Sequence, residues 1–137
     1  MKVLGIDIGG SAFKGAPVDT KTGRLLAERH RVEVKSPCSL KEGIAAAREI
    51  ARHFNWKGPV GVGFPGIIRQ GRIGAVGNLG RVWENQNGAV LVRRATGCPV
   101  RLLNDDDSAG LAEMQCGKGR GKKKAVLCTT FGTGIGS

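Results

Sequence analysis

The stretch GIDIGGS at residues 5–11 decides the fold, because it joins a strand pattern to a tight glycine turn. Val3–Ile8 is an apolar run with the length of a buried strand, and the glycine pair after it predicts a hairpin. Glycine leaves backbone N–H groups open to a phosphate, since no side chain stands in the way. We therefore expect a turn that binds a phosphate donor, with a plain hairpin as the structural alternative. The residues expected to contact the donor are Asp7, Gly9, Gly10, Ser11 and Lys14.

Asp7 has a second expected role, as a ligand of Mg²⁺. It lies near the end of the strand that leads into the glycine turn, so its carboxylate is expected to face the same phosphates. At phosphate sites, Mg²⁺ is held by one or two carboxylates together with phosphate oxygens and water. The sequence predicts that Asp7 binds Mg²⁺ directly or through a water molecule.

The hydrophobic pattern of the remaining chain predicts an α/β fold. Ser39 and Glu42 have the spacing of a capping box, which predicts a helix over Leu40–Phe54. Further strands are expected at Phe13–Asp19, Arg24–Val34, Pro59–Phe64, Pro99–Leu103 and Ala125–Phe131, a hairpin at Ile67–Val76 around Gln70-Gly71, and further helices at Gly88–Ala95 and Asp105–Cys116.

A second chemical segment follows the strand at Pro99–Leu103, where an amide and three acids precede a helix. Ligands of α/β sheets usually bind at the ends of strands. A kinase needs a carboxylate that accepts the proton of the attacking hydroxyl, and we assign this role to Asp105. Asn104 can hydrogen-bond sugar hydroxyls, and Asp107 is expected to cap the helix. The alternative is that all three acids serve only the helix N-terminus.

Two other glycine-rich segments have weaker signals. The stretch Thr130–Gly136 repeats a strand followed by a glycine turn, but it matches neither a Walker loop nor a dinucleotide fingerprint. Asn78 lies in the polar loop Gly77–Gly80, where it can reach a sugar hydroxyl, although most loop asparagines only form turns.

Charge and cysteine content narrow the classes of function. The chain has 22 Lys plus Arg against 11 Asp plus Glu, a net charge of +11, which attracts polyanions. The four cysteines lack metal-ligand spacing, which predicts free thiols and no zinc cluster. Met1 leads directly into a strand pattern, and no apolar run reaches membrane-spanning length. We expect a cytoplasmic protein with no membrane contact.

The order of the motifs resembles that of the ROK family of sugar kinases, in the branch that uses inorganic polyphosphate. The resemblance covers essentially the whole chain and rests on residues 4–11, 14–19, 58–66, 95–100, 103–105, 109–114 and 130–137. It implies an actin-like ATPase or ribonuclease H-like α/β domain, with a mixed five-stranded sheet, flanking helices and a second domain missing. Residues 1–121 would form the N-terminal kinase lobe, and residues 122–137 the first strand and phosphate loop of a truncated C-terminal lobe.

The resemblance also implies roles for individual residues. Asp105 would be the general base for the 6-hydroxyl of glucose, and Asn78 and Asn104 would hold the sugar together with Asp105. The donor would be inorganic polyphosphate or ATP, with Mg²⁺ near Asp7 and a homodimer at full length. The second phosphate loop would contain Gly132, Thr133 and Gly134.

Two departures from the family pattern bear on activity. Asp106 stands where similar proteins tend to have a small apolar residue, and its charge is expected to raise the pKa of Asp105. The chain also ends at Ser137, before the second lobe, so we expect the fragment to be inactive or weak because catalysis needs two lobes to close.

Two other functions stay open at this point. One is a non-catalytic remnant that binds a sugar or a partner. The other, a basic nucleic-acid-binding module, is suggested only by charge and lacks a helix-turn-helix or an aromatic stacking surface. We expect no nucleic-acid partner.

Overall fold

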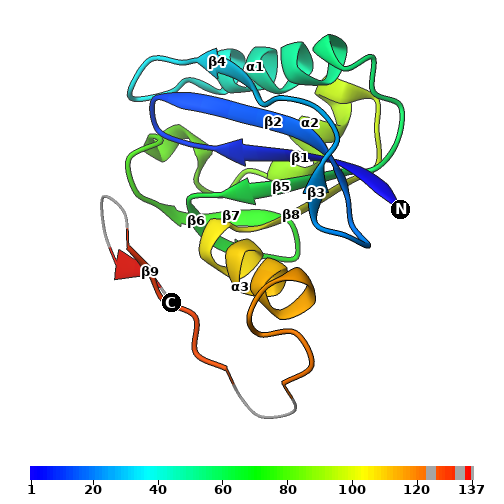
Figure 1. Ribbon diagram of the computed structural model, residues 1–137. Coiled ribbons are helices and arrows are strands. Elements are labelled where there is room, and N and C mark those ends of the chain that lie inside the picture. Colours follow the sequence, from blue (N-terminus) through cyan, green and yellow to red (C-terminus); the bar gives the residue numbers. More distant parts are fainter. Residues whose placement is uncertain (123–125, 132–134, 137) are drawn as a thin grey trace.

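The computed structural model describes residues 1–122, 126–131 and 135–136. A six-stranded sheet forms its centre, in the order β3-β2-β1-β5-β8, with β4 also paired to β2 (Figure 1). The strands of this sheet are β1 (Lys2–Ile8), β2 (Ala12–Asp19), β3 (Arg24–Leu25), β4 (His30–Glu33), β5 (Val60–Phe64) and β8 (Val100–Asn104). The remaining elements are α1 (Leu40–His53), β6 (Gly66–Arg69), β7 (Arg72–Val76), the 3₁₀ helix η1 (Arg81–Trp83), α2 (Gly88–Thr96), α3 (Asp105–Cys116), β9 (Thr130–Phe131) and β10 (Ile135–Gly136).

The sheet is mixed, as expected. β1 and β2 form an antiparallel hairpin through the glycine turn, whereas β1, β5 and β8 run parallel. Parallel strands need a crossover, and α1 and α2 supply these connections. The carboxyl ends of β1, β5 and β8 therefore lie at one edge of the sheet, which is where an α/β sheet usually binds its ligand.

The main core lies between the sheet and α1 with α2. Alternate residues of β1 and β5 are buried and belong to one core cluster: Leu4, Ile6, Ile8, Val60, Val62 and Phe64. α1 contributes Ala46, Ala47 and Ile50 to the same cluster. The capping box is confirmed, since Ser39 accepts from the Glu42 backbone N–H and the Glu42 side chain accepts from the Ser39 N–H. It fixes the start of α1 at the predicted residue.

α3 lies against β5 and β8, apart from α1 and α2 (Figure 1). Its bounds are the predicted ones, yet none of its residues is buried. Leu111, for example, remains half exposed. α3 is thus a lightly covered helix, held mainly through its first turn.

The predicted third strand, Arg24–Val34, is wrong as a single element. β3 and β4 both pair with β2, but their registers differ by two residues. Pro17 explains the break, because proline has no N–H for the ladder. Its carbonyl accepts from the Leu26 N–H at 2.8 Å, but it cannot return a bond. β3 and β4 therefore follow one another along the same edge of β2, and the sheet of six strands is five strands wide.

The hairpin at Ile67–Val76 is confirmed as β6 and β7. Gln70 and Gly71 both have positive φ, 50° and 78°, which is the conformation of a two-residue turn between antiparallel strands. After the hairpin, the chain forms the 3₁₀ helix η1, which was not predicted from the sequence. η1 places Trp83 in the core, where its side chain is 1% exposed.

The strand expected at Ala125–Phe131 is largely wrong. Ala125 lies outside the described residues, residues 126–129 are not in a strand, and only Thr130–Phe131 forms β9. β9 pairs with β10, and residues 126–129 have no partner strand in the part of the chain that the structure describes. Extended backbone needs such a partner to satisfy its N–H and C=O groups.

All four cysteines are free thiols, as expected. Among the described residues, no helix has both the length and the apolar character needed to cross a membrane.

Candidate active site

Asp7 and Asp105 lie on either side of one glycine at the carboxyl edge of the parallel strands. Asp7 is paired in register with Gly63 of β5, and a side chain added at Gly63 would contact Asp105 Cα at 3.6 Å. Asp7 is also paired with Lys14 on the opposite strand, β2. Lys14, Asp7, Gly63 and Asp105 thus lie in a row across the end of the sheet. Gly63 leaves the space between the two carboxylates unfilled.

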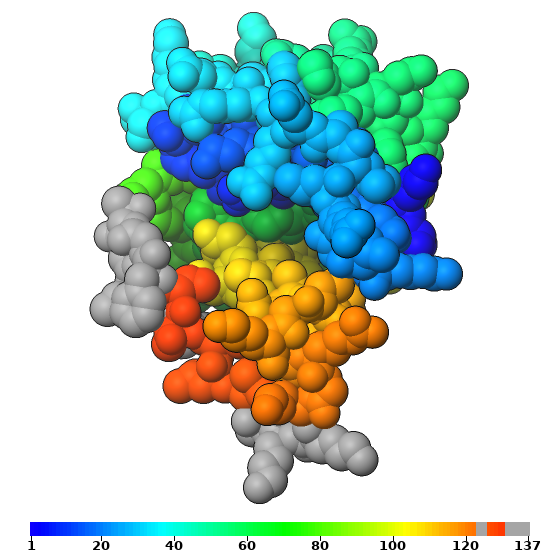
Figure 2. Space-filling model, viewed as in Figure 1, coloured from blue at the N-terminus to red at the C-terminus, as the bar shows by residue number. Residues whose placement is uncertain are grey.

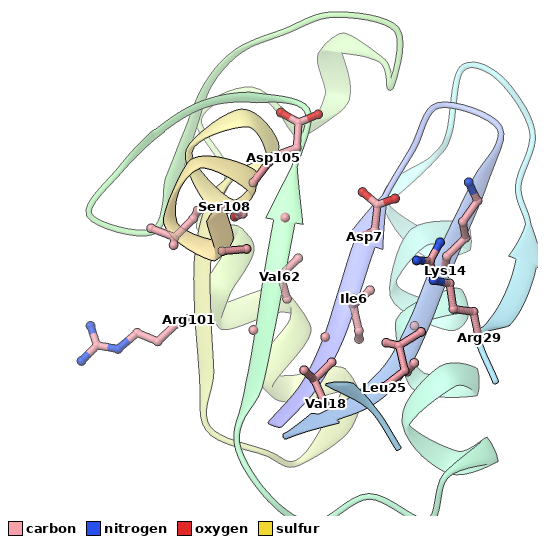
Figure 3. Close-up of a pocket in the computed structure, with 18 residues that line it drawn as sticks. Ile6, Asp7, Lys14, Val18, Leu25, Arg29, Val62, Arg101, Asp105 and Ser108 are labelled. Atoms are coloured by element: carbon pink, nitrogen blue, oxygen red, sulfur yellow. The ribbon is translucent and has the colours of Figure 1, made fainter. Parts of the chain in front are cut away.

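A cavity of about 590 Å³ begins at this row and extends along the open face of the sheet. Asp7, Lys14 and Asp105 all line it. The hollow is visible between the blue N-terminal strands and the yellow and orange α3 (Figure 2). In the close-up, the carboxylates of Asp7 and Asp105 lie toward the same end of the sheet, and Lys14 lies beyond Asp7 (Figure 3). The arrangement suits a ligand with a negative group near Lys14 and a polar group near Asp105.

Partial burial raises the pKa of Asp105 above its ordinary value. The negative charge of Asp106 adds to this effect, as the sequence predicted, and Asp7 adds a smaller contribution. Hydrogen bonds from backbone N–H groups, including that of Asp106, act in the opposite direction. Such a carboxylate is a stronger proton acceptor once ionised than an ordinary aspartate.

Asn104 caps α3, and the expectation that Asp107 does so is wrong. The Asn104 Oδ1 accepts from the backbone N–H groups of Asp106 and Asp107, at 2.9 and 3.1 Å. Asp107 is already inside the first helical turn, because the helix begins at Asp105. The Asn104 Nδ2 donates to the Gly66 carbonyl at 3.0 Å. Asn104 therefore fixes the position of Asp105 and joins β8 to β6.

The glycine turn lies against the loop that carries Asn78. A side chain added at Gly10 would come within 3.3 Å of the Asn78 carbonyl oxygen and 3.4 Å of Asn78 Cβ. Asn78 itself is exposed, and so is Ser11. The turn between β1 and β2 is closed by the Gly9 N–H, which donates to the Ala12 carbonyl at 3.1 Å. The structure thus brings two segments together that are 68 positions apart in the sequence.

The candidate residues of the second phosphate loop cannot be placed relative to this cluster. Gly132, Thr133 and Gly134 are outside the described residues. The basic segment before them includes Lys118, Arg120 and Lys122, which are exposed.

Sequence reasoning missed two features of the site. Gly63 separates the two carboxylates, and the alternation of glycines in β5 was the available signal. Arg29 lines the cavity near Lys14 (Figure 3), but nothing in its local sequence distinguishes it from the other surface arginines.

The described residues contain no group of three or more histidine, cysteine or acidic side chains that could hold a metal by themselves. Mg²⁺ does not need such a group when a phosphate donor supplies most of its ligands. The exposed carboxylate of Asp7, beside the glycine turn, is a hard oxygen ligand of the required kind. The residues present therefore fit Mg²⁺ bound together with a donor.

A mixed sheet with two aspartates and a glycine turn at its carboxyl edge defines the α/β lobe of the actin-like ATPase fold. The ROK family model matches residues 3–137, so the chain belongs to the ROK family. This confirms the resemblance seen in the sequence.

Individual relatives agree with this membership. The chain is 37% identical over 135 residues to polyphosphate glucokinase of Mycobacterium tuberculosis, covering 98% of this chain and 51% of the relative. It is 32% identical over 147 residues to beta-glucoside kinase of Listeria innocua, covering 99% of this chain and 45% of the relative. The chain thus spans about half the length of the curated relatives it matches.

Solved structures give the same picture. The inorganic polyphosphate/ATP-glucomannokinase of Arthrobacter sp. strain KM superposes with a TM-score of 0.91 at 40% identity, over 98% of this chain and 56% of the other. A ROK family glucokinase of Streptomyces griseus, solved in complex with glucose and AMPPNP, gives a TM-score of 0.80 at 28% identity, over 99% of this chain and 43% of the other.

Proposed function

We propose that this chain is the N-terminal lobe of a sugar kinase that transfers a phosphoryl group from polyphosphate or ATP to the 6-hydroxyl of glucose. The observation that carries this proposal is the pair Asp7 and Asp105, which lie on either side of Gly63 at the carboxyl edge of the parallel strands β1, β5 and β8. Membership of the ROK family supports the same reaction class. The names of the relatives support glucose as acceptor and polyphosphate or ATP as donor.

In the proposed reaction Asp105 is the general base. Its carboxylate accepts the proton of the sugar hydroxyl as the hydroxyl oxygen attacks the terminal phosphorus of the donor. The bond from that phosphorus to the bridging oxygen breaks, and the shortened donor leaves with the bonding electrons. Asn78 and Asn104 hold the sugar hydroxyls beside Asp105. The second hydrogen of the Asn104 amide is available for this, since its described bonds use Oδ1 and one donation to Gly66.

The donor phosphates bind on the other side of Asp7. Gly9, Gly10 and Ser11 supply the turn, and Lys14 supplies a positive charge. Gly132, Thr133 and Gly134 form the second phosphate loop. Asp7, together with oxygens of the donor, would hold Mg²⁺, which would neutralise charge that develops on the phosphates.

Residues 1–121 are proposed to form one lobe, and residues 122–137 the start of a second. The open cavity and the exposed α3 agree with a site that a second lobe completes. The complete protein is proposed to be a cytoplasmic homodimer without a nucleic-acid partner.

The chain of 137 residues is expected to be inactive or weakly active by itself, because its site is open on the side where the second lobe would close. The test is a coupled assay for glucose 6-phosphate with glucose, Mg²⁺ and either polyphosphate or ATP. The same assay on the chain extended through a C-terminal lobe is expected to show turnover. Full activity of the short chain would contradict the two-lobe proposal, and no activity of the extended chain would contradict the kinase proposal.

Long polyphosphate is expected to bind the extended protein more tightly than ATP. The physical reason is the charge of +11, with exposed Lys118, Arg120 and Lys122 along one segment. The measurement is competition between the two donors at matched ionic strength, repeated at higher salt, where the advantage of polyphosphate should shrink. Equal binding of ATP and long polyphosphate would contradict the donor preference.

A further inference from the structure

Asp106 forms a hydrogen bond that connects two distant parts of the chain. The Thr130 hydroxyl in β9 donates to Asp106 Oδ1 in the first turn of α3. Both side chains are half-buried. The Asp106 backbone N–H is bonded separately to Asn104 Oδ1 and Asp105 Oδ1, so the carboxylate is free to bind outside its own helix.

A second contact follows one turn further along α3. A side chain added at Gly110 would meet Cys128 Cβ and Sγ at 3.7 Å. Positions 106 and 110 are four apart, so they lie on the same face of a helix. The segment Cys128–Thr130 therefore runs along this face in the direction opposite to α3. Gly110 lets the segment approach closely, and Asp106 bonds its end.

The bond of Asp106 matters because, among the described residues, it is the side-chain hydrogen bond that joins β9 to α3. In the described part of the chain, β9 pairs only with β10, and Thr130 makes no other side-chain hydrogen bond. β9 also lies directly before Gly132 in the sequence. Whatever holds Thr130 thus sets where β9 lies relative to Asp105.

We propose that Asp106 is a positioning residue: it fastens the Cys128–Thr130 segment to α3 and so sets where β9, which directly precedes the proposed second phosphate loop in the sequence, lies relative to Asp105. This inference rests on the proposed function for the role of that loop, but the fastening itself does not. An aspartate suits the task because a charged acceptor binds a hydroxyl more strongly than a neutral one. The consequence for Asp105 is a second negative charge next to the general base.

Alkylation of Cys128 by N-ethylmaleimide measures the fastening in the chain itself. Asp106→Ala and Thr130→Val are each expected to speed modification of Cys128 by about threefold to tenfold, the effect of losing one such hydrogen bond. Thr130→Ser keeps the hydroxyl and should restore the wild-type rate. Mass spectrometry resolves each cysteine, and the exposed Cys116 serves as an internal standard.

Asp107→Ala is the matched control, since it removes the same charge from the same turn and Asp107 makes no described side-chain bond to the Cys128–Thr130 segment. It should leave the Cys128 rate unchanged. Thr130→Val removes the bond without changing any charge, so it separates opening of the segment from an effect of charge on the thiol. Unchanged rates in Thr130→Val, or equal increases in Asp107→Ala, would overturn the proposal.

Phosphotransfer by the extended protein distinguishes positioning from a merely structural role. Thr130→Val should lower kcat about threefold to tenfold, leave KM for glucose unchanged and leave the acid limb of the pH profile in place. Unchanged kcat with faster Cys128 alkylation would overturn the positioning role. No phosphotransfer by the wild-type extended protein would contradict the proposed function alone, and the alkylation rates would still decide whether Asp106 holds Thr130.

Discussion

Asp105→Asn is expected to lower the rate of phosphotransfer by the extended kinase by about 10²- to 10⁴-fold, which is the usual contribution of a general base. Asparagine has nearly the same shape and can still hydrogen-bond a sugar hydroxyl, but it cannot accept the proton. Glucose affinity, measured by calorimetry, should therefore change little while kcat falls. The coupled assay gives kcat, with Asp107→Asn as a control that removes a neighbouring charge without touching the site.

The pH profile supplies a second test of the same assignment. Asp105 must be ionised to act as a base, so the rate rises with pH as this carboxyl loses its proton. Burial and the charges of Asp106 and Asp7 raise its pKa, which places the acid limb at higher pH than for an ordinary aspartate. Asp106→Asn removes one of these causes and should move the limb to lower pH. If the acid limb of the pH profile does not move in Asp106→Asn, or if Asp105→Asn keeps full activity, Asp105 is not the general base.

The parallel strands and the helices could be predicted because their signals are local. The Ser39 and Glu42 capping box determined the start of α1, and the apolar runs determined the positions of β1, β5 and β8. The Gln70-Gly71 turn likewise followed from its residue types. In each case a few adjacent residues were sufficient to define the conformation.

One error arose where a residue of a neighbouring strand controls the outcome, and another where the end of the preceding strand controls it. The break between β3 and β4 depends on Pro17, which lies on the neighbouring strand and withholds one N–H from the ladder. Asn104 displaced Asp107 as the cap because the preceding strand ends with an extended backbone at Asn104, directly before the helix. The effect of Pro17 depends on pairing between strands, and a pattern read along one segment does not contain that information.

The candidate site was predicted in its parts but not in its arrangement. Asp7 and Asp105 were each chosen from local motifs, and the register of β1 with β5 is what brings them to the two sides of Gly63. The contact between Gly10 and the Asn78 loop likewise depends on how β6 and β7 fold back. Pairing across the sheet is a long-range property, and one sequence alone does not contain it.

Trp83→Ala is expected to lower the free energy of unfolding of the chain by about 3–5 kcal/mol, the usual cost of removing a buried aromatic side chain. Trp83 is 1% exposed and packs near Phe64 with ring centroids 5.7 Å apart. Its indole N–H donates to the Cys38 carbonyl at 2.9 Å. A side chain added at Gly43 would lie within 2.7 Å of two Trp83 ring atoms, so the ring packs directly against the backbone of α1. Urea unfolding followed by far-UV circular dichroism measures the loss.

Trp56→Ala is the matched control, because Trp56 also donates its indole N–H to a backbone carbonyl, that of Pro59 at 3.0 Å, but is only half-buried. Trp56→Ala should lower the free energy of unfolding clearly less than Trp83→Ala does. An equal decrease in the two variants would contradict the packing argument. Since small domains have only about 5–15 kcal/mol of stability, Trp83→Phe serves if the alanine variant does not fold. It keeps most of the ring and should cost about 1–2 kcal/mol through the lost hydrogen bond.

The effect of Trp83 should extend to the candidate site, because the segment that it holds also holds the Asn78 loop. Cys38 accepts from the Trp83 indole, and its own N–H donates to the Leu79 carbonyl at 2.8 Å. Leu79 is fully buried and is the direct neighbour of Asn78. Trp83→Phe is therefore expected to weaken glucose binding by the extended kinase as well as stability, whereas Trp56→Ala should affect stability alone. Unchanged glucose affinity in Trp83→Phe would show that the Asn78 loop keeps its position without this connection.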